Sequence, residues 1–259
     1  MLRARKRFGQ HFLHDQNIID RILRAIDPQA EDRLIEIGPG RGELTYPLLR
    51  LCRQLTAVEL DRDLVPILEA GSARFGRLEV INADILKFDL SSLPGGRRYR
   101  LVGNLPYNIS TPLMFHLLES VELIQDMHFM VQKEVALRIG ADSGNANYGR
   151  LSVMLQYHCD CQYLFEVGPE SFKPPPKVDS AMIRLVPHEK PKQDIGDYEL
   201  FSRIVRTAFS QRRKTISNSL KSMLDRETFI ACGIDPGLRA ENLAIADFAK
   251  LSLTLFNGR

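Results

Sequence analysis

The sequence predicts an α/β protein in which a parallel, doubly wound sheet is followed by a small helical domain. Residues 33–134 alternate short apolar runs with stretches of helical spacing, and this alternation is typical of a parallel sheet covered by helices. Beyond residue 197, apolar side chains recur at helical spacing only. We therefore predict a sheet domain over residues 1–187 and a helical domain over residues 188–259.

Five apolar runs are the expected strands: RLIEIG (33–38), QLTAVEL (54–60), LEVINADI (78–85), YRLVGN (99–104) and DMHFMVQKE (126–134). After the fourth strand, Thr111 is expected to be the N-cap of a helix with Pro112 at its first position. Parallel strands joined by helices place their ligand crevice at the carboxyl ends of the strands. The residues directly after each strand are therefore the candidates for a functional site.

The pattern becomes less regular after residue 149. The stiff loop FKPPPKVDS, whose consecutive prolines favour extended geometry, lies between the apolar segments GRLSVMLQY and CQYLFEV and the strand-like SAMIRLV. The polar stretch 188–197 is expected to be a linker. Helices are expected after it at YELFSRIVRTAF, RKTISNSLKSML and ENLAIADFAKLSLTLF.

Composition excludes several classes of protein. The chain of 259 residues is 44% hydrophobic and 26% charged, as in ordinary globular proteins. No apolar run reaches the roughly 18 residues of a membrane span, and the basic N-terminus lacks the apolar core of a signal peptide. We expect a cytoplasmic protein without membrane contact. Cys159 and Cys161 have no second pair at ligand spacing, so free thiols are expected and no metal site.

A glycine-rich turn, EIGPGRG, follows the first expected strand. Gly38 and Gly40 would allow close approach of the backbone to a ligand, or form no more than a tight turn. A dinucleotide fingerprint would require a third glycine where Glu43 stands. An acidic side chain there repels a pyrophosphate, which argues against NAD.

Acidic residues follow the next two strands. Glu59 suits the hydroxyls of a ribose, and Asp84 could accept a hydrogen bond from an adenine amino group. Either residue alone is more often a solvated strand end. Together with the glycine turn they predict a nucleoside site without a phosphate clamp.

The motif GNLPYNIS follows the fourth strand. Pro106 restricts the backbone of Leu105 and so fixes the direction of its carbonyl. That carbonyl and the side-chain oxygen of Asn104 could accept both hydrogens of a planar amine, while Tyr107 offers its ring face to the attached base. The alternative is a proline-terminated turn with a core tyrosine.

Basic residues gather in the helical tail and in the N-terminal arm. They predict contacts with a nucleic-acid backbone, although a solvated helix face would show the same pattern. The predicted RNA contacts are Arg206, Arg212, Arg213, Lys214 and Lys221 in the tail, and Arg5, Lys6 and Arg7 in the arm.

Taken in order, several segments resemble the ribosomal RNA adenine dimethyltransferases over nearly the whole chain. The segments are RKRFGQHFLHD, EIGPGRGELT, VELDRD, GNLPYNISTPLMFHLL, MVQKEVALRI, YGRLSVMLQY, FKPPPKVDSAMIRL and FSQRRKTISNSL. The resemblance implies a Rossmann-like methyltransferase sheet that uses S-adenosyl-L-methionine. It also implies a monomeric enzyme that dimethylates two adjacent adenosines of 16S rRNA in a late small-subunit assembly intermediate.

The resemblance also assigns roles to individual positions. It implies cofactor contacts for His11, Leu13, Gly38, Gly40, Glu59, Asp84 and Asn104. It implies a catalytic set of Asn104, Leu105, Pro106, Tyr107 and Phe172, in which the two aromatic rings stack on the target base. The alternatives are a macrolide-resistance methyltransferase acting on large-subunit RNA, a non-catalytic ribosome assembly factor, and a nicotinamide dehydrogenase.

Overall fold

A computed structural model describes residues 11–211 and 213–258 of the chain. It divides into two compact units, the first formed by residues up to Ala136 together with Cys161–Pro187. The second unit is formed by Leu137–Asp160 and the residues from His188 onward. Residues 137–160 thus group with the helical unit and not with the sheet unit in which the sequence placed them. Aromatic packing explains this grouping, because the ring of Tyr157 lies 4.9 Å from that of Phe201.

The first unit contains a seven-stranded sheet in the order β4-β3-β2-β5-β6-β9-β7. The five predicted strands are confirmed, and they pair in parallel with their neighbours among themselves. The last of them, β6, pairs antiparallel with β9. The bounds are β2 Leu34–Ile37, β3 Gln54–Glu59, β4 Arg77–Asn82, β5 Tyr99–Asn104, β6 Ile124–Gln132, β7 Cys159–Val167 and β9 Ser180–Pro187.

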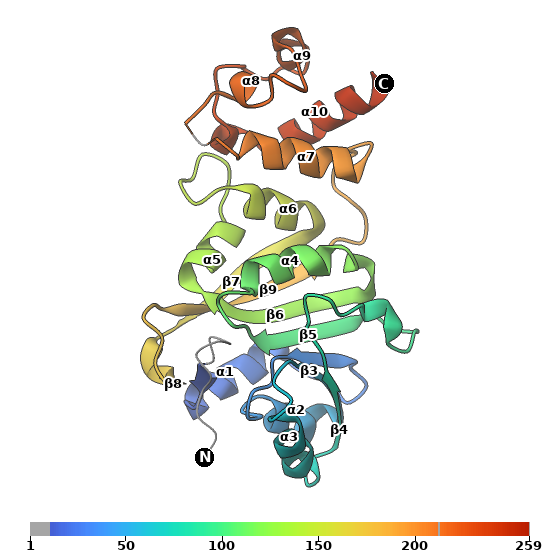
Figure 1. Cartoon of the computed structure of the whole chain (residues 1–259), viewed down its shortest axis with the longest axis vertical. Coiled ribbons are helices and arrows are strands. Elements are labelled where there is room, and N and C mark those ends of the chain that lie inside the picture. Colours follow the sequence, from blue (N-terminus) through green and yellow to red (C-terminus); the bar gives the residue numbers. More distant parts are fainter. Residues whose placement is uncertain (1–10, 212, 259) are drawn as a thin grey trace. The chain divides into compact units, whose positions relative to one another are not determined.

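Helices cover the sheet. Side chains alternate between the faces of a strand, and Leu34, Val102 and Met130 pack in one core with helices α1 and α2. Figure 1 shows α4 beside β5 and β6, away from these two helices. The helices of this unit are α1 Gln16–Ile26, α2 Thr45–Cys52, α3 Val65–Ser72, α4 Ser110–Leu118 and the start of α5 Lys133–Ile139, with short 3₁₀ turns at Leu90–Ser92, Val121–Leu123 and Pro169–Ser171.

Helix α4 begins earlier than predicted. Its N-cap position is Ile109, without a side-chain cap, so the expectation of Thr111 as N-cap is wrong. The backbone already turns before the helix, because the Ile109 amide donates to the Pro106 carbonyl at 3.1 Å. The hydroxyl of Ser110, the first helical residue, donates to the Tyr107 carbonyl at 3.1 Å. The helix is therefore continuous with the turn of the GNLPYNIS motif.

A two-stranded ribbon lies outside the main sheet. Strand β1, Phe12–Leu13, pairs antiparallel with β8, Phe172–Lys173. Figure 1 shows β8 beside the beginning of the chain's described part, near α1. The ribbon joins the N-terminal segment to the proline loop. Its strands are too short to produce a pattern in the sequence, and no strand was predicted at either place.

The second unit is helical, as predicted for the tail. Its elements are α6 Arg150–His158, α7 Tyr198–Ala208, α8 Ile216–Ser219, α9 Arg226–Ala231, α10 Ile245–Asn257 and a 3₁₀ turn at Ala240–Asn242. The long helix expected over RKTISNSLKSML is only the short α8. Polar side chains explain its length, since Ser217 donates to the Pro236 carbonyl and Asn218 to Thr215 instead of supporting a longer helix.

The described residues contain neither a membrane-spanning helix nor a metal-binding cluster. No helix among them is long and apolar enough to cross a membrane. No group of three or more His, Cys, Asp or Glu side chains in that part of the chain could hold a metal ion. The four cysteines, which all lie in the described part, form no disulfide bond with one another.

Candidate active site

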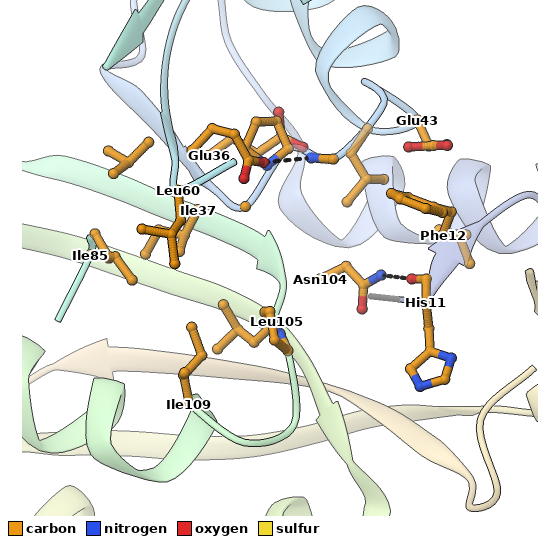
Figure 2. Close-up of a pocket in the computed structure, with 18 of the residues that line it drawn as sticks. His11, Phe12, Glu36, Ile37, Glu43, Leu60, Ile85, Asn104, Leu105 and Ile109 are labelled. Carbon is orange, nitrogen blue, oxygen red and sulfur yellow. Dashed lines mark hydrogen bonds between the residues drawn. The ribbon is translucent and has the colours of Figure 1, made fainter. Parts of the chain in front are cut away.

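A cavity of about 350 Å³ lies at the carboxyl ends of β2, β3, β4 and β5. The order of the parallel strands reverses between β2 and β5, which is where doubly wound sheets bind their ligands. The cavity is lined by the predicted loops and by the N-terminal segment: residues 11–13, 36–40, 43–44, 58–60, 83–85 and 104–109. In Figure 2, Leu60, Ile85 and Ile109 lie on one side of this cavity, and Glu43 and Phe12 on the other.

The glycine turn brings backbone close to this cavity. Gly38 and Gly40 both line it, with φ of 65° and 61°. A Cβ atom on Gly40 would lie 3.2 Å from the ring of Phe12. Gly42 has another purpose, because a Cβ atom there would lie 2.5 Å from the ring of Tyr46. The third glycine therefore allows the turn to pack against Tyr46 of α2.

Both predicted acidic residues line the cavity. Glu59 is 5% exposed, and its carboxylate accepts from the amides of Gly40 at 3.2 Å and Asp61 at 2.8 Å. Burial raises the pKa of this carboxyl. Asp84 lies two residues beyond the end of β4, which stops at Asn82 and not at residue 85 as predicted. Both carboxyl groups reach one space from neighbouring strand ends.

Two further acids line the cavity without having been assigned a role. Glu36 is 2% exposed and accepts a hydrogen bond of 2.6 Å from the Thr45 hydroxyl. Burial raises its pKa to about 8. Glu43 accepts from the Arg41 amide at 3.2 Å, and burial raises its pKa also. An acid inside the apolar strand LIEI was the signal that could have identified Glu36.

The side chain of Asn104 is held by the N-terminal segment. Its Nδ2 donates to the His11 carbonyl at 2.9 Å, and Figure 2 shows these two residues facing each other. The amide oxygen of Asn104 is therefore oriented away from that carbonyl as an acceptor. The amide of Leu105 donates to the Met130 carbonyl at 3.0 Å, which ties the next residue to the sheet.

Tyr107 is held from two directions. Its hydroxyl lies 2.7 Å from the hydroxyl of Ser180, and its ring stacks on that of His11 with centroids 5.7 Å apart. The Nδ1 atom of His11 lies 2.7 Å from the Pro174 carbonyl.

The structure brings most of the predicted catalytic and N-terminal residues to the cavity. Those that line it are Asn104, Leu105, Pro106, Tyr107, His11 and Leu13.

Phe172 does not lie in the stacking position that the family resemblance implies for it. Its side chain is 2% exposed, packs in the core that contains Leu13 and Met182, and does not line the cavity. The ring therefore has no face free to stack on a target base in this structure. The proline loop contributes to the site through Pro174 and Ser180 instead.

The predicted RNA contacts fall in two groups. Arg206 on α7 and Arg213, Lys214 and Lys221 after it are exposed, and Ile204 and Ala208 on the same helix are buried. This burial pattern confirms that α7 is amphipathic. Arg5, Lys6, Arg7 and Arg212 lie outside the residues that the structure describes.

A family model described as ribosomal RNA adenine dimethylase matches residues 1–256. This chain belongs to that family. It is 54% identical to Ribosomal RNA small subunit methyltransferase A of Pseudomonas syringae pv. tomato over 254 residues, which cover 98% of this chain and 95% of the relative. It is 53% identical to the protein of the same name from Methylococcus capsulatus, with 97% of each covered.

Solved structures agree with this family. A dimethyladenosine transferase from Plasmodium falciparum superposes with a TM-score of 0.81 and 28% identity over 96% of this chain and 98% of that one. The 23S rRNA methyltransferase ErmE superposes with a TM-score of 0.73 and 27% identity, and the match covers 94% of this chain and 99% of that one. The predicted fold, a Rossmann-like methyltransferase sheet, and the predicted enzyme class, an adenine methyltransferase of ribosomal RNA, are confirmed by these findings. The nicotinamide dehydrogenase alternative is wrong.

Proposed function

We propose that this chain transfers methyl groups from S-adenosyl-L-methionine to the N6 amines of two adjacent adenosines near the 3′ end of 16S rRNA. The observation that carries the proposal is the oriented amide of Asn104. Its nitrogen is engaged by the His11 carbonyl, so its oxygen is available as an acceptor in the cavity. Relatives that are 54% and 53% identical bear a small-subunit methyltransferase name, which supports the choice of RNA.

The residues of the cavity fit this cofactor. Glu36, Glu43 and Glu59 bring three acidic side chains to one space, and a ligand with a sulfonium and an ammonium group would favour their ionised forms. Glu59 would hold the ribose hydroxyls and Asp84 the adenine amino group, between apolar side chains at Leu60 and Ile85. Gly38 and Gly40 leave room for the methionine part, with backbone contacts from His11 and Leu13.

When bound, S-adenosylmethionine supplies an electrophilic methyl group. The chain's own residues position the nucleophile. An adenine N6 is a poor nucleophile because its lone pair is spread into the ring. The amide oxygen of Asn104 and the carbonyl of Leu105 accept hydrogen bonds from the amine, which favours a pyramidal nitrogen with its lone pair directed into the cavity. No general base is needed, because the cationic nitrogen loses its proton to water after transfer.

The same loop receives the base. An adenine inside a duplex cannot enter the cavity, so the target nucleotide must be unpaired or flipped out. Stacking on the ring of Tyr107 would contribute roughly 1–3 kcal/mol to holding it there. For the second methyl the amine has one hydrogen left, so one of the two acceptors is then sufficient.

The basic residues would bind the RNA backbone. Arg206, Arg213, Lys214 and Lys221 are exposed on the second unit and suit phosphate contacts, together with Arg5, Lys6, Arg7 and Arg212. RNA recognition of this kind depends largely on shape. We infer that the substrate is a late assembly intermediate of the small subunit, bound by a monomer in the cytoplasm.

Labelled cofactor tests the proposal. The protein is incubated with tritiated S-adenosylmethionine and, in separate reactions, with unmethylated small subunits, methylated small subunits and large subunits, and the labelled bases are mapped. We expect label only in the unmethylated small subunits, at two adjacent adenosines. Label in the large subunit would indicate the activity named for ErmE. The absence of transfer to either subunit would indicate a non-catalytic assembly factor.

A further inference from the structure

The hydroxyl of Tyr107 is bound to a residue that has not been assigned a role. Ser180 has no exposed surface and is the first residue of β9, where it pairs with Gln132 of β6. Its Oγ lies 2.7 Å from the Tyr107 hydroxyl. Ser180 does not line the cavity, whereas Tyr107 does. A buried position of the sheet is therefore linked directly to a ring that faces the ligand.

The same ring is held on a second side. The ring of His11 stacks on Tyr107 at an interplanar angle of 28°, and its Nδ1 contacts the Pro174 carbonyl. The carbonyl of Tyr107 accepts from the Ser110 hydroxyl at 3.1 Å. With the backbone and one ring face already held, the Ser180 bond restrains the remaining end of the side chain, which is its phenolic oxygen.

The hydroxyl pair persists at neutral pH. Burial raises the pKa of the Tyr107 phenol above its ordinary value, so the oxygen keeps its proton. A neutral phenol and a serine hydroxyl can each donate or accept in such a pair. Tyr107→Phe would keep the aromatic ring and remove only this contact, and Ser180→Ala would remove the same contact from the sheet side.

On the basis of the proposed function, we propose that Ser180 is a positioning residue for methyl transfer. Its hydroxyl fixes the ring of Tyr107 in one rotamer and thereby fixes where the target base stacks. An untethered ring would occupy other rotamers, and fewer complexes would hold the amine in line for transfer. The cofactor contacts do not involve Ser180, so the loss should fall on turnover and leave cofactor binding unchanged.

A double-mutant cycle tests this coupling on small subunits. Ser180→Ala and Tyr107→Phe are each expected to lower kcat by about 3- to 10-fold, the effect of losing one neutral hydrogen bond. The double variant should lose no more than either single variant. The KM for S-adenosylmethionine should stay at the wild-type value in all three. Ser180→Thr keeps the hydroxyl and should recover most of the rate.

A matched serine provides the control. Ser72 is also buried and donates to the Glu69 carbonyl at 2.9 Å, but it does not line the cavity or contact Tyr107, so Ser72→Ala should keep the wild-type kcat. Wild-type turnover in Tyr107→Phe, or multiplicative losses in the double variant, would overturn the role of Ser180. If Ser180→Ala does not fold, the kcat of Tyr107→Phe alone tests the proposal, because this variant removes the same hydroxyl contact from the loop side. Failure of the wild-type protein to label small subunits would refute the proposed function instead.

Discussion

Asn104 is held by one hydrogen bond that decides which atom of its amide faces the cavity. The bond runs to the carbonyl of His11, a residue 93 positions away in the sequence. Glu36 shows the same dependence on surroundings, because its pKa of about 8 results from burial beside a single hydroxyl donor, Thr45. Single residues of this site therefore have properties that their neighbours in the fold confer.

Asn104→Ala is expected to abolish methyl transfer, with a loss of at least about a hundredfold, because the oriented acceptor of the target amine is removed. Cofactor binding should persist in part, since Glu59 and Asp84 remain. Tritium transfer measures the first effect and calorimetry with S-adenosylmethionine the second. Asn17→Ala removes an exposed amide outside the cavity and should leave both unchanged. Near-normal turnover in Asn104→Ala would contradict the proposed mechanism.

The pH dependence of cofactor binding is expected to report on Glu36. Below a pH of about 8 this carboxyl is protonated in the free protein, because burial raises its pKa. A cationic ligand favours the ionised form and lowers that pKa, so affinity should rise with pH up to about 8, by at most about tenfold per pH unit, and then level. Calorimetry across this range measures the slope.

Glu36→Gln separates this effect from titration of the ligand itself. The variant has no ionisable group at this position, so its affinity should vary less with pH than that of the wild-type protein. Parallel curves for the two proteins would show that Glu36 does not titrate with binding.

The elements that build the site are short and depend on close packing. The glycine turn between β2 and α2 and the ribbon of β1 and β8 both bring backbone to the cavity. The ribbon places His11 against the end of β5 and buries Phe172 in the core beneath. A substitution in the glycine turn or in the ribbon should therefore lower both the free energy of unfolding and the affinity for the cofactor.

Gly42→Ala tests the turn. Gly42 has a φ of 93°, so an alanine there would strain the backbone. Its Cβ atom would also lie 2.5 Å from the Tyr46 ring and overlap with it. We expect a loss of about 2 kcal/mol or more in the free energy of unfolding, measured by denaturant titration. Gly144 is a matched control, because its φ of 87° is similar but nothing lies within 4 Å of an added Cβ. Equal losses in the two variants would show that only backbone strain matters.

Stability of the whole molecule depends on buried polar groups within each unit. In the first unit, Arg100 donates to Asp126 at 3.0 Å, to Asp32 at 2.6 Å and to the carbonyl of Ile26, which ties α1 to β5 and β6. His128 lies beside this cluster, near Arg184, and burial lowers its pKa to about 4. In the second unit, burial lowers the pKa of His158 to about 4 as well.

Folding stability is expected to fall between pH 6.5 and pH 4. An unfolded histidine takes up a proton near pH 6.5, whereas His128 stays neutral in the fold until about pH 4. The contribution of neutral His128 to the free energy of unfolding is therefore fully present above pH 6.5. It is lost on acidification, and the loss for this residue is up to about 3 kcal/mol. Denaturant titrations at several pH values measure the slope.

His128→Leu should reduce this slope, because the group that takes up a proton on unfolding is removed, while His158 still contributes. His14→Leu is the control, since it replaces an exposed histidine and keeps His128 in place. An unchanged slope in His128→Leu would show that other groups cause the acid sensitivity.

Local patterns identified most of the site. The glycine turn, Glu59, Asp84 and the GNLPYNIS loop were each placed after an apolar run, and they do line one cavity. The helix start at Thr111 was wrong because the preceding turn already satisfied the backbone. The resemblance implies a stacking role for Phe172, but its ring is buried, and nothing near it along the chain distinguishes a core ring from an exposed one. The segment RKTISNSLKSML has the spacing of a helix, and its pattern does not show that only Ile216–Ser219 is helical.

The alternation of strands and helices, the functional edge of the sheet and the family can be predicted from periodicity and short motifs. The contacts of His11 with Asn104 and of Ser180 with Tyr107, and the cavity that Glu36 shares with Glu59, become visible in the folded chain. These residues are far apart along the chain. Asn104 lies 93 residues from His11 and Tyr107 lies 73 from Ser180, so these contacts exist only once the sheet and its ribbon have formed.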